Sequence, residues 1–246
     1  MNEITAMGWA LAYTAIFLLG NSKAGLKGLS IFNVTLLALA FGARDSTGIL
    51  MPLLLVGDIF AVIYYNRHAQ WKYIWQFLPW MVLGILIGTA VGADLPEAQF
   101  KVGMVIVIFI SLAALIYWDK RKGQKVPTHW TFASGVGIVA GITTMIGNLA
   151  GAFTNIFFLA MRLPKNEFVG TAAWLFLITN AFKLPFHIFI WKTINKESLL
   201  IDLKLLPAIF FGMVLGVYLV RIINEKQYRR FVIVVTAIGA VAILSR

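Results

Sequence analysis

Residues 141–151 read GITTMIGNLAG and residues 20–30 read GNSKAGLKGLS, and each segment interrupts an otherwise apolar stretch of the chain. Glycine disfavours the interior of a helix, so glycines at this density predict a break. The apolar stretches that contain the two segments, 4–41 and 131–161, are too short for two membrane spans and a turn, because one span requires about 20 residues. Each stretch therefore predicts a re-entrant hairpin, in which two half-helices meet in a bend.

The composition is that of a protein whose solvent is lipid. Of its 246 residues, 60% are hydrophobic and 13% are charged, whereas soluble domains are about 45–50% apolar and about 25% charged. Further apolar runs lie between short charged loops and are close to the length that crosses a bilayer. These features predict an all-α polytopic membrane protein with the lipid bilayer as its surroundings.

The net charge of +11 is concentrated in loops. Basic residues gather at 66–72, 119–129 and 221–230, a distribution that is typical of the cytoplasmic face of a membrane protein. They do not alternate with exposed aromatic residues on a polar surface, so no nucleic-acid partner is expected. The chain has no cysteine, which excludes disulfides and thiolate metal sites.

The chain contains an internal duplication. An offset of 122 residues aligns Asp58 with Asn180, and after a six-residue insertion an offset of 128 aligns Gly84 with Gly212. Both halves contain the pattern LPxxxxGxxxG. Glycines at this spacing are best explained by close helix packing, because small residues let two helix backbones approach.

Each half is predicted to consist of one hairpin and three membrane spans. The first repeat, 1–120, contains the hairpin 4–41 and spans near 47–65, 76–93 and 101–118, and the second, 121–246, contains the hairpin 131–161 and spans near 168–190, 203–222 and 229–245. The basic loops all lie in the cytoplasm only if the second hairpin bends back instead of crossing. An odd number of spans per half gives the two repeats opposite orientation, so we expect a single domain of two inverted repeats.

The two bends predict a binding site for an anion. Helix N-termini carry unpaired N–H groups and about half a positive charge, and glycine allows an oxyanion to approach the backbone. Lys23 and Lys27 add formal charge; a lysine inside the bilayer costs about 2.5–3.5 kcal/mol and is functional by default. The alternative is that both lysines extend to the membrane surface. The predicted substrate-binding residues are Ser22, Lys23, Gly25, Lys27 and Gly28 from the first bend and Thr143, Thr144, Gly147 and Asn148 from the second.

A second set of polar residues is expected inside the helices that follow the hairpins. Asn180, Lys183 and His187 follow one another at spacings of three and four, which places them on one helix face. We expect Asp58 to form an ion pair with Lys183, with His187 as a titratable neighbour. These four residues are the candidates for coupling or gating, with proton coupling as a further hypothesis. The alternatives are a static structural ion pair and a hydrogen-bonded structural histidine.

No constellation in the sequence points to catalysis. It contains no H-x-x-x-H pattern and no glutamate-rich pair within a span, so we expect no enzymatic activity, no catalytic residue, no metal and no cofactor. A passive anion channel would use the same lysines and helix ends, and it is the alternative to a transporter. A scaffold without transport would leave the intramembrane lysines unexplained.

Five segments carry a resemblance to a known family. They are GNSKAGLKGLS, RDSTGILMPLLLVGDIFAVIYYNRHAQWK, GITTMIGNLAG, LAMRLPKNEFVGTAAW and KLPFHIF. In this order, and over nearly the whole chain, they resemble the TauE/SafE sulfite exporter family. The resemblance implies a multi-pass permease of the bacterial inner membrane that exports a small inorganic or organic sulfur oxyanion, sulfite or an organosulfonate. A homo-oligomer is compatible with the sequence.

The expected mechanism follows from this architecture. The anion would bind near the midplane, between the two hairpin tips. One repeat would then rock against the other, with the GxxxG faces as the sliding contact, to expose the site to each side in turn.

Overall fold

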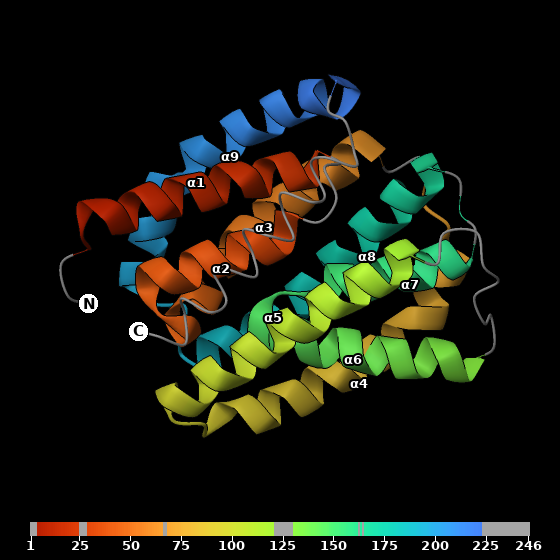
Figure 1. Ribbon diagram of the computed structural model, residues 1–246, viewed down its shortest axis with the longest axis horizontal. Coiled ribbons are helices and arrows are strands. Elements are labelled where there is room, and N and C mark those ends of the chain that lie inside the picture. The colour runs from red at the N-terminus through yellow and green to blue at the C-terminus, as the bar shows by residue number, and fades with distance from the viewer. Residues whose placement is uncertain are drawn as a thin grey trace.

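The computed structural model describes residues 4–24, 29–65, 68–120, 130–161, 163 and 165–222. These residues are almost entirely helical and contain no strand, which confirms the predicted all-α class. The helices are α1 (Ala6–Lys23), α2 (Leu29–Phe41), α3 (Ala43–Tyr65), α4 (Trp71–Ala93), α5 (Glu97–Lys120), α6 (Trp130–Gly147), α7 (Ala150–Ala160), α8 (Lys165–Pro185), the π-helical segment η2 (Phe186–Ile190) and α9 (Lys196–Ile222). They run roughly side by side in one bundle (Figure 1).

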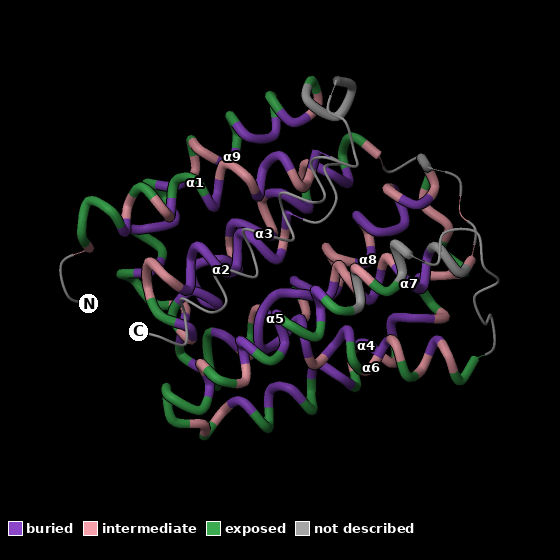
Figure 2. The backbone as a smooth tube through the Cα atoms, in the orientation of Figure 1, coloured by how far each residue is buried: buried purple, intermediate pink, exposed green. Residues whose placement is uncertain are grey.

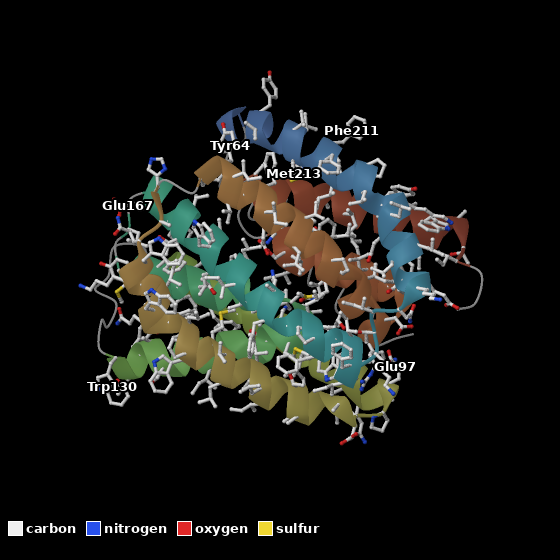
Figure 3. All side chains as sticks on the ribbon, turned by 180° about the vertical axis from the view of Figure 1, so that it is seen from behind. Tyr64, Glu97, Trp130, Glu167, Phe211 and Met213 are labelled. Atoms are coloured by element: carbon white, nitrogen blue, oxygen red, sulfur yellow. The ribbon has the colours of Figure 1, made fainter. Side chains whose placement is uncertain are left out.

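The outer surface of the bundle is apolar. Among the described residues, five helices are long and apolar enough to cross a membrane. Helices α4 and α9 both carry exposed residues (Figure 2). Among them Leu86 on α4 is 44% exposed and Phe211 on α9 is 71% exposed, and Figure 3 shows the Phe211 side chain on the outside of the bundle. Exposed apolar faces of this extent suit lipid and not water. The predicted span at 229–245 lies outside the described residues.

Both glycine-rich stretches contain a helix break. In the first, α1 ends at Lys23 and α2 begins at Leu29; in the second, α6 ends at Gly147 and α7 begins at Ala150. The first arm of each pair is longer than the half-helix that the sequence predicts. Helices α1 and α6 each have 18 residues, about 27 Å at 1.5 Å per residue, which is close to the thickness of a bilayer core. The apolar sequence lets the first arm extend until the break, so only the second arms, of 13 and 11 residues, are short.

The two arms of the first pair pack antiparallel. A Cβ atom added at Gly8, near the start of α1, would lie 3.8 Å from the carbonyl oxygen of Ala40, near the end of α2. Midway along the pair, the side-chain amide of Asn33 has its partners satisfied in the orientation that directs its nitrogen to the Ala15 carbonyl at 3.1 Å and its oxygen to Leu19 N–H at 3.1 Å. Asn33 is fully buried, so these bonds satisfy a polar group that would otherwise be costly in an apolar interior.

Each hairpin packs against a long helix of the other half. Helix α1 lies along α9, with Gly20 against Gly212, and α6 lies along α4, with Gly141 against Gly84. A Cβ atom on Gly20 would lie 2.3 Å from the Ile209 carbonyl oxygen, and one on Gly141 would lie 2.1 Å from the Met81 carbonyl oxygen. The glycines of the LPxxxxGxxxG pattern therefore serve close helix packing, as predicted.

Helices α3 and α8 meet at the centre of the bundle. The side-chain nitrogen of Asn180 on α8 donates to Asp58 Oδ2 on α3 at 2.6 Å. These two residues occupy aligned positions of the duplication. Two positions that the sequence duplication aligns are therefore in direct contact between α3 and α8.

Candidate functional site

A cavity of about 120 Å³ lies where the two helix breaks approach α3 and α8. One water needs roughly 10–15 Å³ of such space, so the cavity has room for several waters or a small ligand. Its polar lining consists of Ser22 and Lys23 from α1, Ser30 from α2, Asp58 from α3, Thr144 and the adjoining Asn148 from the second break, Asn155 from α7 and Asn180 from α8.

Some of the predicted substrate-binding and coupling residues line the cavity and others do not. Thr143, Gly147, Lys183 and His187 do not line it. The Thr143 hydroxyl donates to the Ala140 carbonyl within α6, and a Cβ atom on Gly147 would meet Leu149 and Val107. Gly25, Lys27 and Gly28 lie outside the described residues.

Lys23, Asp58 and Asn180 form a chain of interactions across the cavity. The Lys23 ammonium donates to Asp58 Oδ1, and Asn180 binds the other carboxylate oxygen. The predicted ion pair between Asp58 and Lys183 is therefore wrong. The reason is geometric, because the end of α1 brings Lys23 to Asp58 and a sequence does not show which helices adjoin. The Lys23 ammonium also lies 5.4 Å from the centre of the Phe176 ring, a favourable distance for a cation–π contact.

Lys183 is held by oxygen atoms at the end of α6. Its ammonium donates to the Thr144 carbonyl oxygen at 3.1 Å, to the Thr144 hydroxyl at 3.1 Å and to Asn148 Oδ1 at 2.7 Å. The side chain is fully buried. Unsatisfied carbonyl groups give a helix C-terminus a partial negative charge, so this position stabilises a cation.

Asn148 follows Gly147, the last residue of α6, and its backbone conformation stops the helix. Its φ of 54° lies in the left-handed region, which asparagine tolerates better than most residues with a side chain. The Asn148 and Leu149 N–H groups donate to the carbonyls of Thr144 and Thr143 at 2.9 and 3.2 Å. The side-chain nitrogen reaches the Thr47 carbonyl on α3 at 3.4 Å, which directs the side-chain oxygen toward Lys183.

The N-terminal ends of the two short helices meet at the cavity. Ser30 in the first turn of α2 and Gly151 in the first turn of α7 both line it, and a Cβ atom on Gly151 would lie 3.6 Å from the Ser30 hydroxyl oxygen. The first N–H groups of a helix have no partner within that helix. Both short helices therefore direct their positive ends toward one space, an arrangement that favours an anion.

The formal charges around the cavity add to the same preference. Lys23 and Asp58 line the cavity, and the Lys183 ammonium lies behind Thr144 and Asn148, which also line it. Among the described residues these three ionisable groups carry one excess positive formal charge. One wall is apolar and consists of Phe168, Val169, Ala172, Ala173 and Phe176 of α8 with Leu19 and Leu54. A low-polarity wall strengthens the attraction between the positive groups and an anion.

Among the lining residues that the sequence analysis missed are two polar ones, Ser30 and Asn155, and the aromatic Phe176. Ser30 and Asn155 carried a usable signal, because each is a polar residue in the short second arm of a hairpin. Phe176 carried none, since an aromatic residue in an apolar helix is most often part of the core.

The bundle is closed at the end opposite the first turns of α8. Trp191 fills the space beside Gly92, and its indole N–H donates to the Thr89 carbonyl at 3.2 Å. The Arg44 guanidinium donates to the carbonyls of Gly92 at 3.0 Å and Leu95 at 2.5 Å. Figure 3 shows Glu167, near the cavity's α8 wall, and Glu97, near Arg44, at opposite ends of the molecule.

His187 belongs to this closed end. Its Nδ1 lies 2.9 Å from the Thr193 hydroxyl, and its ring packs edge-on against Trp191 with centroids 5.2 Å apart. The carbonyl of His187 accepts from Thr193 N–H where the π-helical segment ends. The histidine is therefore part of the contacts that close the bundle, not of the cavity wall.

Fold and site together define a polytopic helical membrane protein with a polar cavity between two helix breaks. The family model for the sulfite exporter TauE/SafE matches residues 12–243, and the chain belongs to that family. The resemblance found in the sequence is thus confirmed, and so is the assignment to membrane transport of a sulfur-containing anion. Neither the curated proteins nor the solved structures include a match to the chain.

Proposed function

We propose that this chain exports sulfite or an organosulfonate across the inner membrane and binds it near the midplane in the cavity between the two helix breaks. The observation that carries the proposal is the meeting of two helix N-termini beside one excess positive charge. Ser22, Ser30, Asn148 and Asn155 supply donors in addition to Lys23. A small oxyanion has several acceptor oxygens and needs several donors to replace its water.

Alternating access is the mechanism that suits this arrangement. The cavity extends along the first turns of α8, while Trp191 and Arg44 close the far end. We expect the two repeats, 1–120 and 121–246, to lie in inverted orientation and to move against each other. The equivalent glycine contacts of α1 with α9 and of α6 with α4 would be the sliding surfaces. A passive channel would need an open path to the far end.

We propose that Asp58 takes part in proton coupling. Its carboxylate neutralises Lys23 and so competes with the incoming anion for the same ammonium. A proton on Asp58 would release Lys23 to the anion, with Asn180 and Lys183 maintaining the geometry. His187 would act in gating, through its contacts with Trp191 and Thr193 at the closed end.

The test is transport by the purified protein in liposomes. Uptake of labelled sulfite, thiosulfate, short sulfonates and sulfate is measured with and without a pH gradient. We expect sulfite or a sulfonate to accumulate against its gradient, which a passive channel cannot achieve. Uptake that never exceeds equilibrium would favour the channel, and no uptake of any of these anions would contradict the proposal.

Two serines provide a matched pair of variants for locating the site. Ser30 lines the cavity, whereas the Ser134 hydroxyl donates to the Thr131 carbonyl of its own helix and does not line the cavity. We expect Ser30→Ala to raise the half-saturating anion concentration about tenfold, the equivalent of one weak hydrogen bond to a charged group. Ser134→Ala should leave it unchanged. Equal effects of the two substitutions would place the anion elsewhere.

A further inference from the structure

Lys183 has an unusual set of partners for a buried lysine. Its three hydrogen bonds go to a backbone carbonyl, a hydroxyl and an amide oxygen, at 2.7–3.1 Å. None of these partners carries a formal charge. The carboxylate of Asp58 is already bound by Lys23 and Asn180. A buried charge without a counter-ion is costly, so the oxygen atoms at the end of α6 must supply most of its stabilisation.

These oxygen atoms form the kind of site that binds an alkali cation. In transporters built from broken helices, carbonyl groups at the end of a half-helix coordinate the coupling cation. Here Thr144 contributes its carbonyl and hydroxyl oxygens, and Asn148 contributes Oδ1. The bond from Asn148 to the Thr47 carbonyl holds that side-chain oxygen in place. An ammonium group and an alkali cation place the same demand on such a site, which is several oxygen atoms around one positive charge.

We propose that Lys183 is a tethered cation that occupies a monovalent alkali-cation site at the end of α6. The chain therefore carries, on its own side chain, the positive charge that a dissolved sodium or potassium ion would otherwise bring to the anion cavity. The consequence for transport rests on the proposed function, whereas the existence of the cation site does not.

The charge balance of the cavity gives this lysine its role. Without Lys183, the charges of Lys23 and Asp58 cancel, and an arriving anion would leave the cavity net negative inside the membrane. Unbalanced charge at membrane depth is expensive. With Lys183 behind the cavity wall, the charges of the described residues there would sum to zero once a singly charged anion is bound.

Removing the lysine side chain tests the proposal directly. Lys183→Ala deletes the ammonium and leaves space beside the three oxygen atoms, whereas Lys183→Met deletes the charge and fills that space. The purified proteins are heated in sodium, potassium or choline chloride of equal ionic strength. We expect sodium or potassium to raise the melting temperature of K183A relative to choline, because a ligand that binds only the folded state stabilises it. The wild type and K183M should show no such difference.

Transport provides the second measurement. Wild-type uptake should be the same in sodium, potassium and choline. Uptake by K183A should be lost in choline and rise at least about tenfold in sodium or potassium, while K183M stays inactive in all three. Adding Thr144→Val to K183A removes one oxygen ligand and should weaken the cation response.

The proposal is overturned by any of three results: wild-type uptake that requires dissolved sodium or potassium, K183A that responds to neither cation, or K183A that fails to fold in every salt while K183M folds. Recovery of K183A only in sodium or potassium would support it. If no sulfur anion is transported at all, the proposed function fails, and the melting temperatures still decide whether the cation site exists.

Discussion

Substitutions in the ion pair between Lys23 and Asp58 should lower the free energy of unfolding, and the exposure of the two side chains determines by how much. Removing one partner of a buried pair costs about 3–5 kcal/mol, because the other charge is left without compensation. The Lys23 side chain is 13% exposed and Asp58 is 1% exposed. After Asp58→Asn, Lys23 can turn toward water in the cavity, so the loss of unfolding free energy should be near the lower end of this range. After Lys23→Met, the Asn180 amide is the remaining hydrogen-bond donor to Asp58 among the described residues, and the loss should be near the upper end.

A double-mutant cycle separates the pair from its surroundings. In K23M/D58N neither charge is left unpaired, so we expect the double variant to be more stable than the sum of the two losses predicts, with a coupling of about 2–3 kcal/mol. The free energies of unfolding are measured by denaturant titration of the purified proteins in mixed micelles. Losses that add to within about 0.5 kcal/mol would show that the two charges do not interact. A larger loss for D58N than for K23M would contradict the argument from exposure.

Three further predictions concern packing, the end of α6 and the closed end. Gly141→Ala should destabilise the protein by about 1–3 kcal/mol, because its Cβ atom would lie 2.1 Å from a backbone oxygen. The control is Gly103→Ala, whose Cβ atom would have no neighbour within 4 Å and which should be neutral or stabilising by up to about 1 kcal/mol. The melting temperatures of the two variants are compared. Asn148→Ala should cost more than Asn148→Gly by about 1–2 kcal/mol, because only alanine is strained at a φ of 54°, and equal losses in denaturant titrations would rule out that strain. Trp191→Phe removes the hydrogen bond to the Thr89 carbonyl and should increase passive leak of anion from loaded liposomes, and an unchanged leak would show that this contact does not close the bundle.

Much of the fold could be predicted because its signals are local. The excess of apolar residues identifies the solvent as lipid, and glycine density locates the two breaks, since both act on the helix in which they occur. The duplication was detectable for a similar reason, because aligned residues such as Gly84 and Gly212 have the same small-residue requirement wherever two backbones approach. Helices α1 and α6 are longer than predicted, because each break comes only after 18 residues of helix.

The candidate site was predicted less completely, because it depends on neighbours that are distant in the chain. The polar residues Lys23, Asp58, Asn180 and Lys183 were recognisable as unusual in apolar helices. Which of them form pairs could not be predicted, because either lysine could neutralise Asp58 and the sequence does not show which one lies next to it. Ser30 and Asn155 line the cavity only because the tips of the two hairpins meet.

The sequence by itself determined the membrane class, the family, the positions of the helix breaks and the excess of positive charge, since each depends on the kind and local order of residues. Only the tertiary structure decided that Asp58 binds Lys23, that Lys183 is held by the uncharged oxygen atoms at the end of α6, and that His187 lies with the contacts that close the bundle. The physical reason is that electrostatic and hydrogen-bond energies depend on distance and burial, and packing between helices sets both.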